Sequence, residues 1–167
     1  SFAVLFAGPA LALRLMTGAL EAFGPAGDPG GYSPDVYVSG VVTGVVFQQG
    51  VYPTAAYTGT KDTYINQWKP NNNMGGEARL MFGQWGSYRP LIYFDLTSVP
   101  AQYQIPSTAR VVSAQLGIYC YGRNLFKEME AQVYQVIRPW DPAYATWGKA
   151  TAGDNWGIAG CDDTTTD

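Results

Sequence analysis

The 167 residues contain no histidine, and this absence removes several kinds of chemistry. Ser-His-Asp and Cys-His mechanisms need an imidazole base, and most zinc and iron sites use imidazole ligands. Glycoside hydrolysis needs two carboxyl groups that face each other across a groove. Asp162 and Asp163 are adjacent, and Asp62 and Asp95 fall at positions that look structural. The sequence therefore predicts that the protein is not an enzyme.

Hard oxygen ligands are the main metal-binding feature that the sequence offers. Asp62, Asp162 and Asp163 carry carboxylates of the kind that calcium binds, so a structural calcium ion is one interpretation. A solvated acidic tail is the simpler interpretation. Cys120 and Cys161 are the only cysteines. They predict either one disulfide in an extracellular protein or two buried thiols, because two thiols without histidine do not make a zinc site.

Exposed aromatic side chains could form a platform for a sugar ring. Tryptophan, tyrosine and phenylalanine together make up 14% of the chain. The candidates for a glycan platform are Trp68, Trp85 and Tyr88, with Trp85 favoured because it lies between Gln84 and Gly86 in an expected turn. For each of them taken singly, a place in the core is the competing interpretation.

The chain carries few charges, and this limits its partners. Charged residues are 14% of the sequence, whereas soluble domains have about 25%. A neutral surface of this kind suits contact with copies of the same chain or with sugars. The net charge of −3 and the lack of a basic run argue against nucleic acid.

The pattern of apolar residues predicts an all-β protein. Residues 89–100 form the most apolar strand candidate, which Pro100 should end near Val99. Residues 109–121 alternate, with even positions from Val112 to Cys120 predicted to face a core. Further strands are predicted at residues 60–68, 77–82 and 130–137, and a turn at residues 71–76.

Five pieces of the sequence, in order, resemble the DNRLRE-type domain, an extracellular β-sandwich related to a family of carbohydrate-binding modules. They are the segment from Asp62 to Ile65, the loop from Pro70 to Gly76, the strand that begins at Arg89, the alternating strand after Ile105, and the tryptophans Trp140, Trp147 and Trp156 with Gly160. The resemblance implies a jelly-roll-like antiparallel β-sandwich over residues 51–167. It also raises the expectation of a structural calcium ion.

Residues 1–34 form an apolar N-terminal extension that ends in a Gly/Pro linker. Residues 1–23 carry only Arg14 and Glu21 as charges. They can be read as an uncleaved signal peptide, a transmembrane helix, or a short helix or extended segment that packs on neighbouring subunits. We favour the third interpretation, because the basic start of a signal peptide is missing and Pro9 and Arg14 interrupt the apolar run. The residues expected to pack are Phe2, Leu5, Leu11, Leu15 and Phe23.

Residues 35–50 are predicted to contain an extra strand, rich in valine. Its subunit-contact residues would be Val36, Val38, Val42, Val46 and Phe47. An unpaired strand of this kind is sticky, so it should pair either within its own sandwich or with a neighbouring molecule. Modules of the resembled family continue beyond the equivalent of Gly160. The sandwich is therefore expected to lack its last strand, which this segment could replace in cis or in trans.

The sequence thus supports two hypotheses for function. The first is an extracellular structural subunit of a surface filament or pilus-like homopolymer, which meets the membrane only during secretion. The second is a carbohydrate-binding or adhesion module of a larger cell-surface protein. No cofactor other than calcium is expected.

Overall fold

The computed structural model describes residues 6–7, 12–17, 43–83, 86–105, 111–118, 122 and 132–167. The only helical element in these residues is the short 3-10 helix η1 (Ala101–Tyr103), and no described helix is long and apolar enough to cross a membrane. The all-β class is confirmed, whereas the jelly-roll arrangement stays a prediction. The strands are β1 (Phe6–Ala7), β2 (Ala12–Thr17), β3 (Thr43–Gln48), β4 (Thr60–Asn66), β5 (Arg79–Leu80), β6 (Tyr88–Phe94) and β7 (Val111–Gly117).

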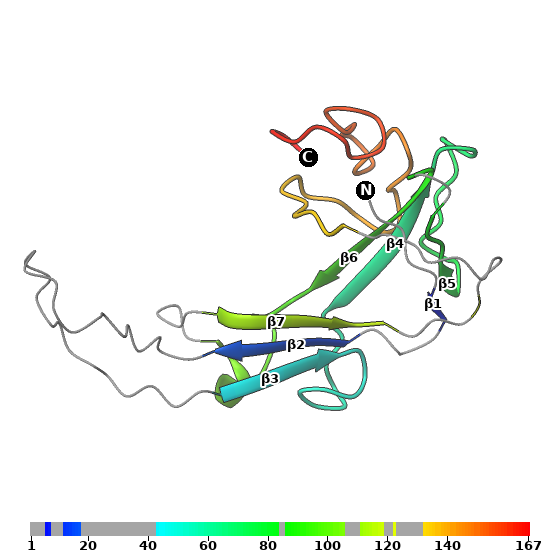
Figure 1. Ribbon diagram of the computed structural model, residues 1–167. Coiled ribbons are helices and arrows are strands. Elements are labelled where there is room, and N and C mark those ends of the chain that lie inside the picture. The colour runs from blue at the N-terminus through cyan, green and yellow to red at the C-terminus, as the bar shows by residue number, and fades with distance from the viewer. Residues whose placement is uncertain are drawn as a thin grey trace, which may run out of the picture.

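Strands β4 and β6 form an antiparallel pair at the centre of the molecule (Figure 1). At one end of the pair Gln67 N–H donates to Ser87 O, and at the other end Asp95 N–H donates to Gly59 O. The alternation of an antiparallel ladder then directs the backbone groups of odd-numbered β6 residues toward β4. Pro90 lies at an even position, so its missing N–H removes no bond to β4.

The two faces of the β4–β6 pair pack against different cores. On one face Ile65 and Leu91 pack with Ala145, Ala150 and Trp156, all from the C-terminal part of the chain. On the other face Tyr64 is buried with Met74 and Leu80, and Tyr88, Ile92 and Phe94 pack against them. The period-2 alternation expected of a strand with two covered faces is therefore present in this pair.

Strand β6 ends at Phe94, five residues before the predicted end at Val99. Asp95 Oδ1 accepts hydrogen bonds from Thr97 N–H (2.8 Å), Thr97 O–H (2.7 Å) and Ser98 N–H (3.1 Å). A carboxylate that binds nearby backbone N–H groups offers them an alternative to the sheet ladder. The chain therefore turns before Pro100 is reached.

The N-terminal segment contributes strands rather than a helix. β2 lies between β3 and β7 and pairs antiparallel with both (Figure 1). Leu15 is thereby opposite Val45 in β3 and Ala114 in β7, while β1 pairs with β5. In the described residues of this segment, 6–7 and 12–17, the chain is extended and forms no helix, because neighbouring ladders pair its backbone groups.

Two strand predictions need correction. Residues 132–137, the described part of the strand predicted at 130–137, form no strand; instead Ile137 and Arg138 N–H both donate to Asp167 O. In β7, the described side chains from Ala114 to Ile118 are all exposed, so the predicted buried face is wrong there. The adjacent described core, with Phe47 at its centre, includes Val45 and Phe47 of β3 but none of these exposed side chains.

Candidate functional site

The C-terminal cap, as we name residues 132–167, lies over one face of the β4–β6 pair (orange to red in Figure 1). It contains turns and a single isolated bridge between Lys149 and Asn155, but no strand or helix. Trp156 is buried, and its indole N–H donates to Thr146 O at 2.9 Å. The backbone of the cap is therefore held by side-chain and turn hydrogen bonds rather than by a ladder.

Arg89 connects β6 to the cap. Its Nε donates to Gly86 O (3.0 Å), and its Nη1 donates to Gly160 O (2.7 Å) and to Asp162 Oδ1 (2.9 Å). The guanidinium also lies 5.1 Å from the centre of the Trp147 ring. These contacts fix the position of the cap edge relative to β6, because the guanidinium group is rigid and its hydrogen bonds are directional.

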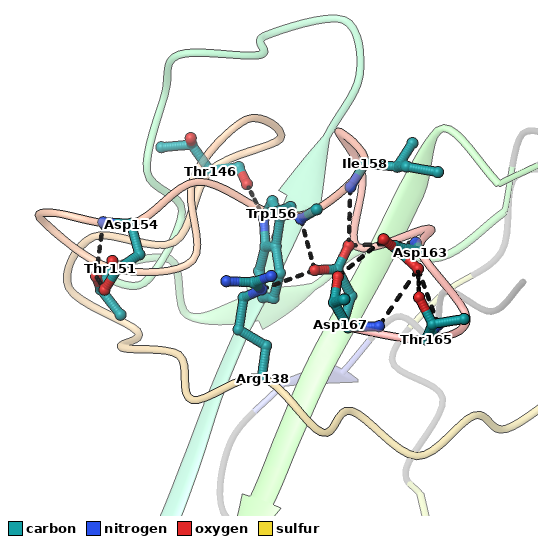
Figure 2. Close-up of polar contacts among 11 residues, drawn as sticks. Arg138, Thr146, Thr151, Asp154, Trp156, Ile158, Asp163, Thr165 and Asp167 are labelled. Atoms are coloured by element: carbon teal, nitrogen blue, oxygen red, sulfur yellow. Dashed lines mark hydrogen bonds and ion pairs between the residues drawn. The ribbon is translucent and has the colours of Figure 1, made fainter.

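Asp167 organises the other side of the cap (Figure 2). Its carboxylate is 1% exposed and accepts hydrogen bonds from Gly157 N–H (2.7 Å), Ile158 N–H (3.1 Å), Asp163 N–H (3.2 Å) and Arg138 Nε (2.8 Å). Burial alone would raise the pKa of Asp167, but the bonds from Gly157, Ile158 and Arg138 outweigh it and hold the pKa below its usual value.

Asp163 forms a turn of the same kind as Asp95 (Figure 2). Its Oδ1 accepts from Thr165 N–H (2.8 Å) and Thr165 O–H (2.6 Å), and its Oδ2 accepts from Thr166 O–H (2.8 Å). The hydrogen bonds from the Thr165 hydroxyl and backbone lower the pKa of Asp163 to about 2. The sequence D-x-T-[S/T] thus builds the same turn twice, at residues 95–98 and 163–166.

A cleft of about 390 Å³ opens where β6 meets the cap. Its apolar lining includes Pro90, Leu91 and Val136, and its polar lining includes Asp162 and Thr164. A cleft of this size with an apolar floor and a few polar groups is typical of binding sites. A second, shallower cleft of about 580 Å³ lies beside Trp156 and is lined by polar groups such as Asn71, Lys149 and Asn155.

The predicted calcium ligands are not assembled. Among the described residues, no group of three or more acidic or cysteine side chains is arranged to hold a metal ion. Asp162 pairs with Arg89, and both Asp163 oxygens accept bonds from threonines, so these carboxylates already have protein donors. Asp62 lies on β4, where burial raises its pKa. These three carboxylates form no metal-binding group among the described residues, and the structural calcium ion stays a prediction.

The cysteine and platform predictions fall partly outside the described residues. Cys161 is a free thiol with a φ of 57°, and burial followed by the charge of Asp167 raises its pKa to about 12. Its proposed partner Cys120 is not described, so the disulfide stays a prediction. Trp68 is 69% exposed, as a glycan platform requires, but Tyr88 packs on the core beside Tyr64, with ring centres 6.2 Å apart. Trp85 lies outside the described residues.

Among the predicted subunit-contact residues, those in β3 contact their own chain. Phe47 is fully buried, and its ring centre lies 5.7 Å from that of Tyr57. Val46 is half-buried, and Leu15 lies in β2. The remaining predicted packing and contact residues lie outside the described residues: Phe2, Leu5, Leu11, Phe23, Val36, Val38 and Val42.

Comparison of the chain with protein-family models, with curated proteins and with solved structures found no match. The resemblance to DNRLRE-type domains therefore stays a prediction.

Sequence reasoning missed the two residues that organise the cap. Arg89 was placed in a strand without a partner, and Asp167 was read as part of a solvated tail. The pattern D-x-T-[S/T] at residues 163–166 was a usable signal, because aspartate followed by threonine two residues later is typical of side-chain-to-backbone turns. No sequence pattern predicts the four donors that surround Asp167, because only the folded chain brings them together.

Proposed function

We propose that the protein is an extracellular structural subunit of a surface filament, in which the N-terminal segment of one subunit inserts into the next. The observation that carries this proposal is the place of β2. It comes from the apolar segment 1–23, yet it is the central strand of the sheet β3–β2–β7. Within one chain, it is joined to β3 through residues 18–42.

A strand connected in this way can be supplied by either of two copies. In the structure β2 pairs with β3 and β7 of its own chain, and the same backbone bonds form if β2 of a second copy takes its place. Residues 18–42, fully extended, reach at most about 80 Å. This length allows the strand to leave its own sheet and enter a neighbour, the arrangement known as β-strand addition.

The edge formed by β7 supports self-association. β7 contains no charged residue, and Leu116 and Ile118 beside it are 37% and 38% exposed. Soluble proteins usually protect an edge strand with charges, proline or a covering segment. Together with the low overall charge, this edge favours a protein that works in contact with its own copies rather than as a free monomer.

An engineered disulfide between β2 and β7 tests the exchange. Leu15 and Ala114 are directly opposite in the register, and opposed residues of neighbouring strands have Cα separations that a disulfide can span. In a background with both native cysteines replaced by serine, the variant Leu15→Cys/Ala114→Cys should give a ladder of covalent oligomers on a non-reducing gel. Electron micrographs of the same sample should show regular fibres.

The matched control is a cysteine pair in β4 and β6, Asp62→Cys with Ile92→Cys, which are also opposite each other. This pair should give only monomers, because both strands belong to one compact unit. A monomer band from the β2–β7 pair, with discrete particles in the micrographs, would refute strand exchange and the filament proposal.

A carbohydrate-binding or adhesion module is the second candidate, and the exposure of Trp68 favours it. An aromatic ring 69% exposed on a turn after β4 is available to stack on a sugar. The test is binding to a glycan array by the native protein and by Trp68→Ala. Binding that depends on Trp68, by a protein that forms no fibres, would favour this function.

A further inference from the structure

We propose that successive subunits also meet end to end, with Lys61 and Tyr93 of one copy seated at the cap cleft of the next. This contact rests on the filament proposal and adds a second interface to it. The observations that point to it are two surfaces of complementary chemistry, which lie toward opposite ends of the same β4–β6 pair.

The first surface is an exposed cation joined to an exposed ring. Lys61 and Tyr93 are opposite each other in the register, and Lys61 Nζ lies 5.6 Å from the centre of the Tyr93 ring. Tyr93 is 45% exposed, and Lys61 is also exposed. The pair presents a positive charge beside an aromatic ring. It lies at the end of β4 and β6 that is away from Arg89 and the cap.

The second surface is the cap cleft, whose lining is apolar at the floor and acidic at the rim. Three aspartates and one arginine line it, and that arginine, Arg89, already has hydrogen bonds to Gly160 and Asp162. Asp162 is 54% exposed, and none of the described donors is bonded to its second oxygen. Beside the cleft, Tyr134 and Ile137 are 61% and 53% exposed.

The two surfaces match in both charge and apolar character. An ammonium group can pair with the free oxygen of Asp162, while the Tyr93 ring covers apolar side chains beside the cleft. Arg89 pairs with Asp162 and Arg138 pairs with Asp167, so the third aspartate of the cleft, Asp163, leaves an excess of negative charge there, and the Lys61 surface is positive. Because the surfaces lie at different places on the same chain, the contact is heterologous, and such contacts build an open filament when the rotation between copies does not close a ring. It therefore fits an open filament.

Charge reversal tests this contact in the full chain. Lys61→Glu and Asp162→Lys should each raise the concentration needed for half-assembly at least about tenfold, because each replaces an attraction by a repulsion. The double variant should restore assembly to within about threefold of the native protein. In about 1 M salt, where charges are screened within about 3 Å, the single variants should differ less from the native protein. Light scattering and sedimentation measure these values.

Two exposed residues outside the proposed contact provide matched controls, Lys69→Glu and Glu77→Lys. Both should assemble like the native protein, and circular dichroism should show that all variants are folded. Assembly unaffected by either reversal, or equally weakened in the controls, would overturn the end-to-end contact while leaving the filament standing. Failure of the double variant to restore assembly would also overturn it. A native protein that never assembles would overturn both proposals.

Discussion

Substitution of Asp167 by asparagine removes one oxygen from a buried carboxylate that accepts four hydrogen bonds. In the native protein Oδ2 accepts from Ile158 N–H and Asp163 N–H, and Oδ1 accepts from Gly157 N–H and Arg138 Nε. The amide of asparagine would place an NH₂ group against two backbone donors if it kept the other two bonds. Hydrogen bonds to a charged group contribute about 1.5–3 kcal/mol each.

We take the lower value of this range for each bond. Two lost bonds then reduce the free energy of unfolding by about 3 kcal/mol. For a domain of this size that corresponds to a fall in melting temperature of about 6–12 °C. The control is Asp162→Asn, whose carboxylate is 54% exposed and bonded to Arg89 alone, and a surface pair of this kind is worth about 0–1 kcal/mol.

The pH dependence of stability gives an independent test of the contribution of Asp167. The pKa of Asp167 in the folded protein is lowered, so the unfolded chain takes up a proton first as the pH falls below about 4. Its contribution to stability is present above that pH and is lost as the pH falls through the folded pKa. Urea unfolding should therefore show a gap between native protein and Asp167→Asn at pH 7 that narrows below pH 4. Equal stability of Asp167→Asn and Asp162→Asn at pH 7 would refute the role given to Asp167.

Two further predictions concern the cap. Gly75→Ala should lower the free energy of unfolding by about 1–3 kcal/mol, because a Cβ there would clash with the backbone oxygen of Pro142. Gly76→Ala meets no atom within 4 Å and should be nearly neutral in the same urea titration. The Cys161 thiol, whose pKa is about 12, should resist iodoacetamide at pH 8 in the native protein and react in urea without a reductant, as followed by mass spectrometry. Failure to react in urea until a reductant is added would show that the thiol is in a disulfide.

Strands β4 and β6 could be predicted from the sequence because each alternates between two covered faces. Ile65 and Leu91 face one core, and Tyr64 and Ile92 the other, so burial and residue type agree locally. The local sequence pattern gave a wrong prediction where contacts with a distant segment determine the structure. Residues 132–137 look like a strand, but their backbone is bonded to a loop about thirty residues further along the chain.

The predictions of function and of site residues stay open for a similar reason. Asp162 and Asp163 have the chemistry that calcium needs, but Arg89, Thr165 and Thr166 already donate hydrogen bonds to their oxygens. No local sequence pattern could show these contacts. The apolar residues of the N-terminal segment predict that it packs on neighbouring subunits, and this stays a prediction. Its pairing with β7, about one hundred residues away, could not be read from either segment alone.

The distribution of stabilising contacts argues for exchange at β2 rather than elsewhere. The β4–β6 pair has a buried core on each face and a cap tied down by Arg89 and Asp167, so opening it would expose most of the apolar interior. The described core beside the sheet β3–β2–β7 has Phe47 of β3 at its centre, and the described β7 side chains from Ala114 onward are exposed. Removing β2 breaks two ladders but leaves both cores of the β4–β6 pair intact. Local opening of this kind costs less than global unfolding, and the ladders are regained when β2 of a neighbour enters. In the proposed filament, a subunit of this kind would exchange its N-terminal strand while the part that presents Lys61, Tyr93 and the cap cleft stays folded.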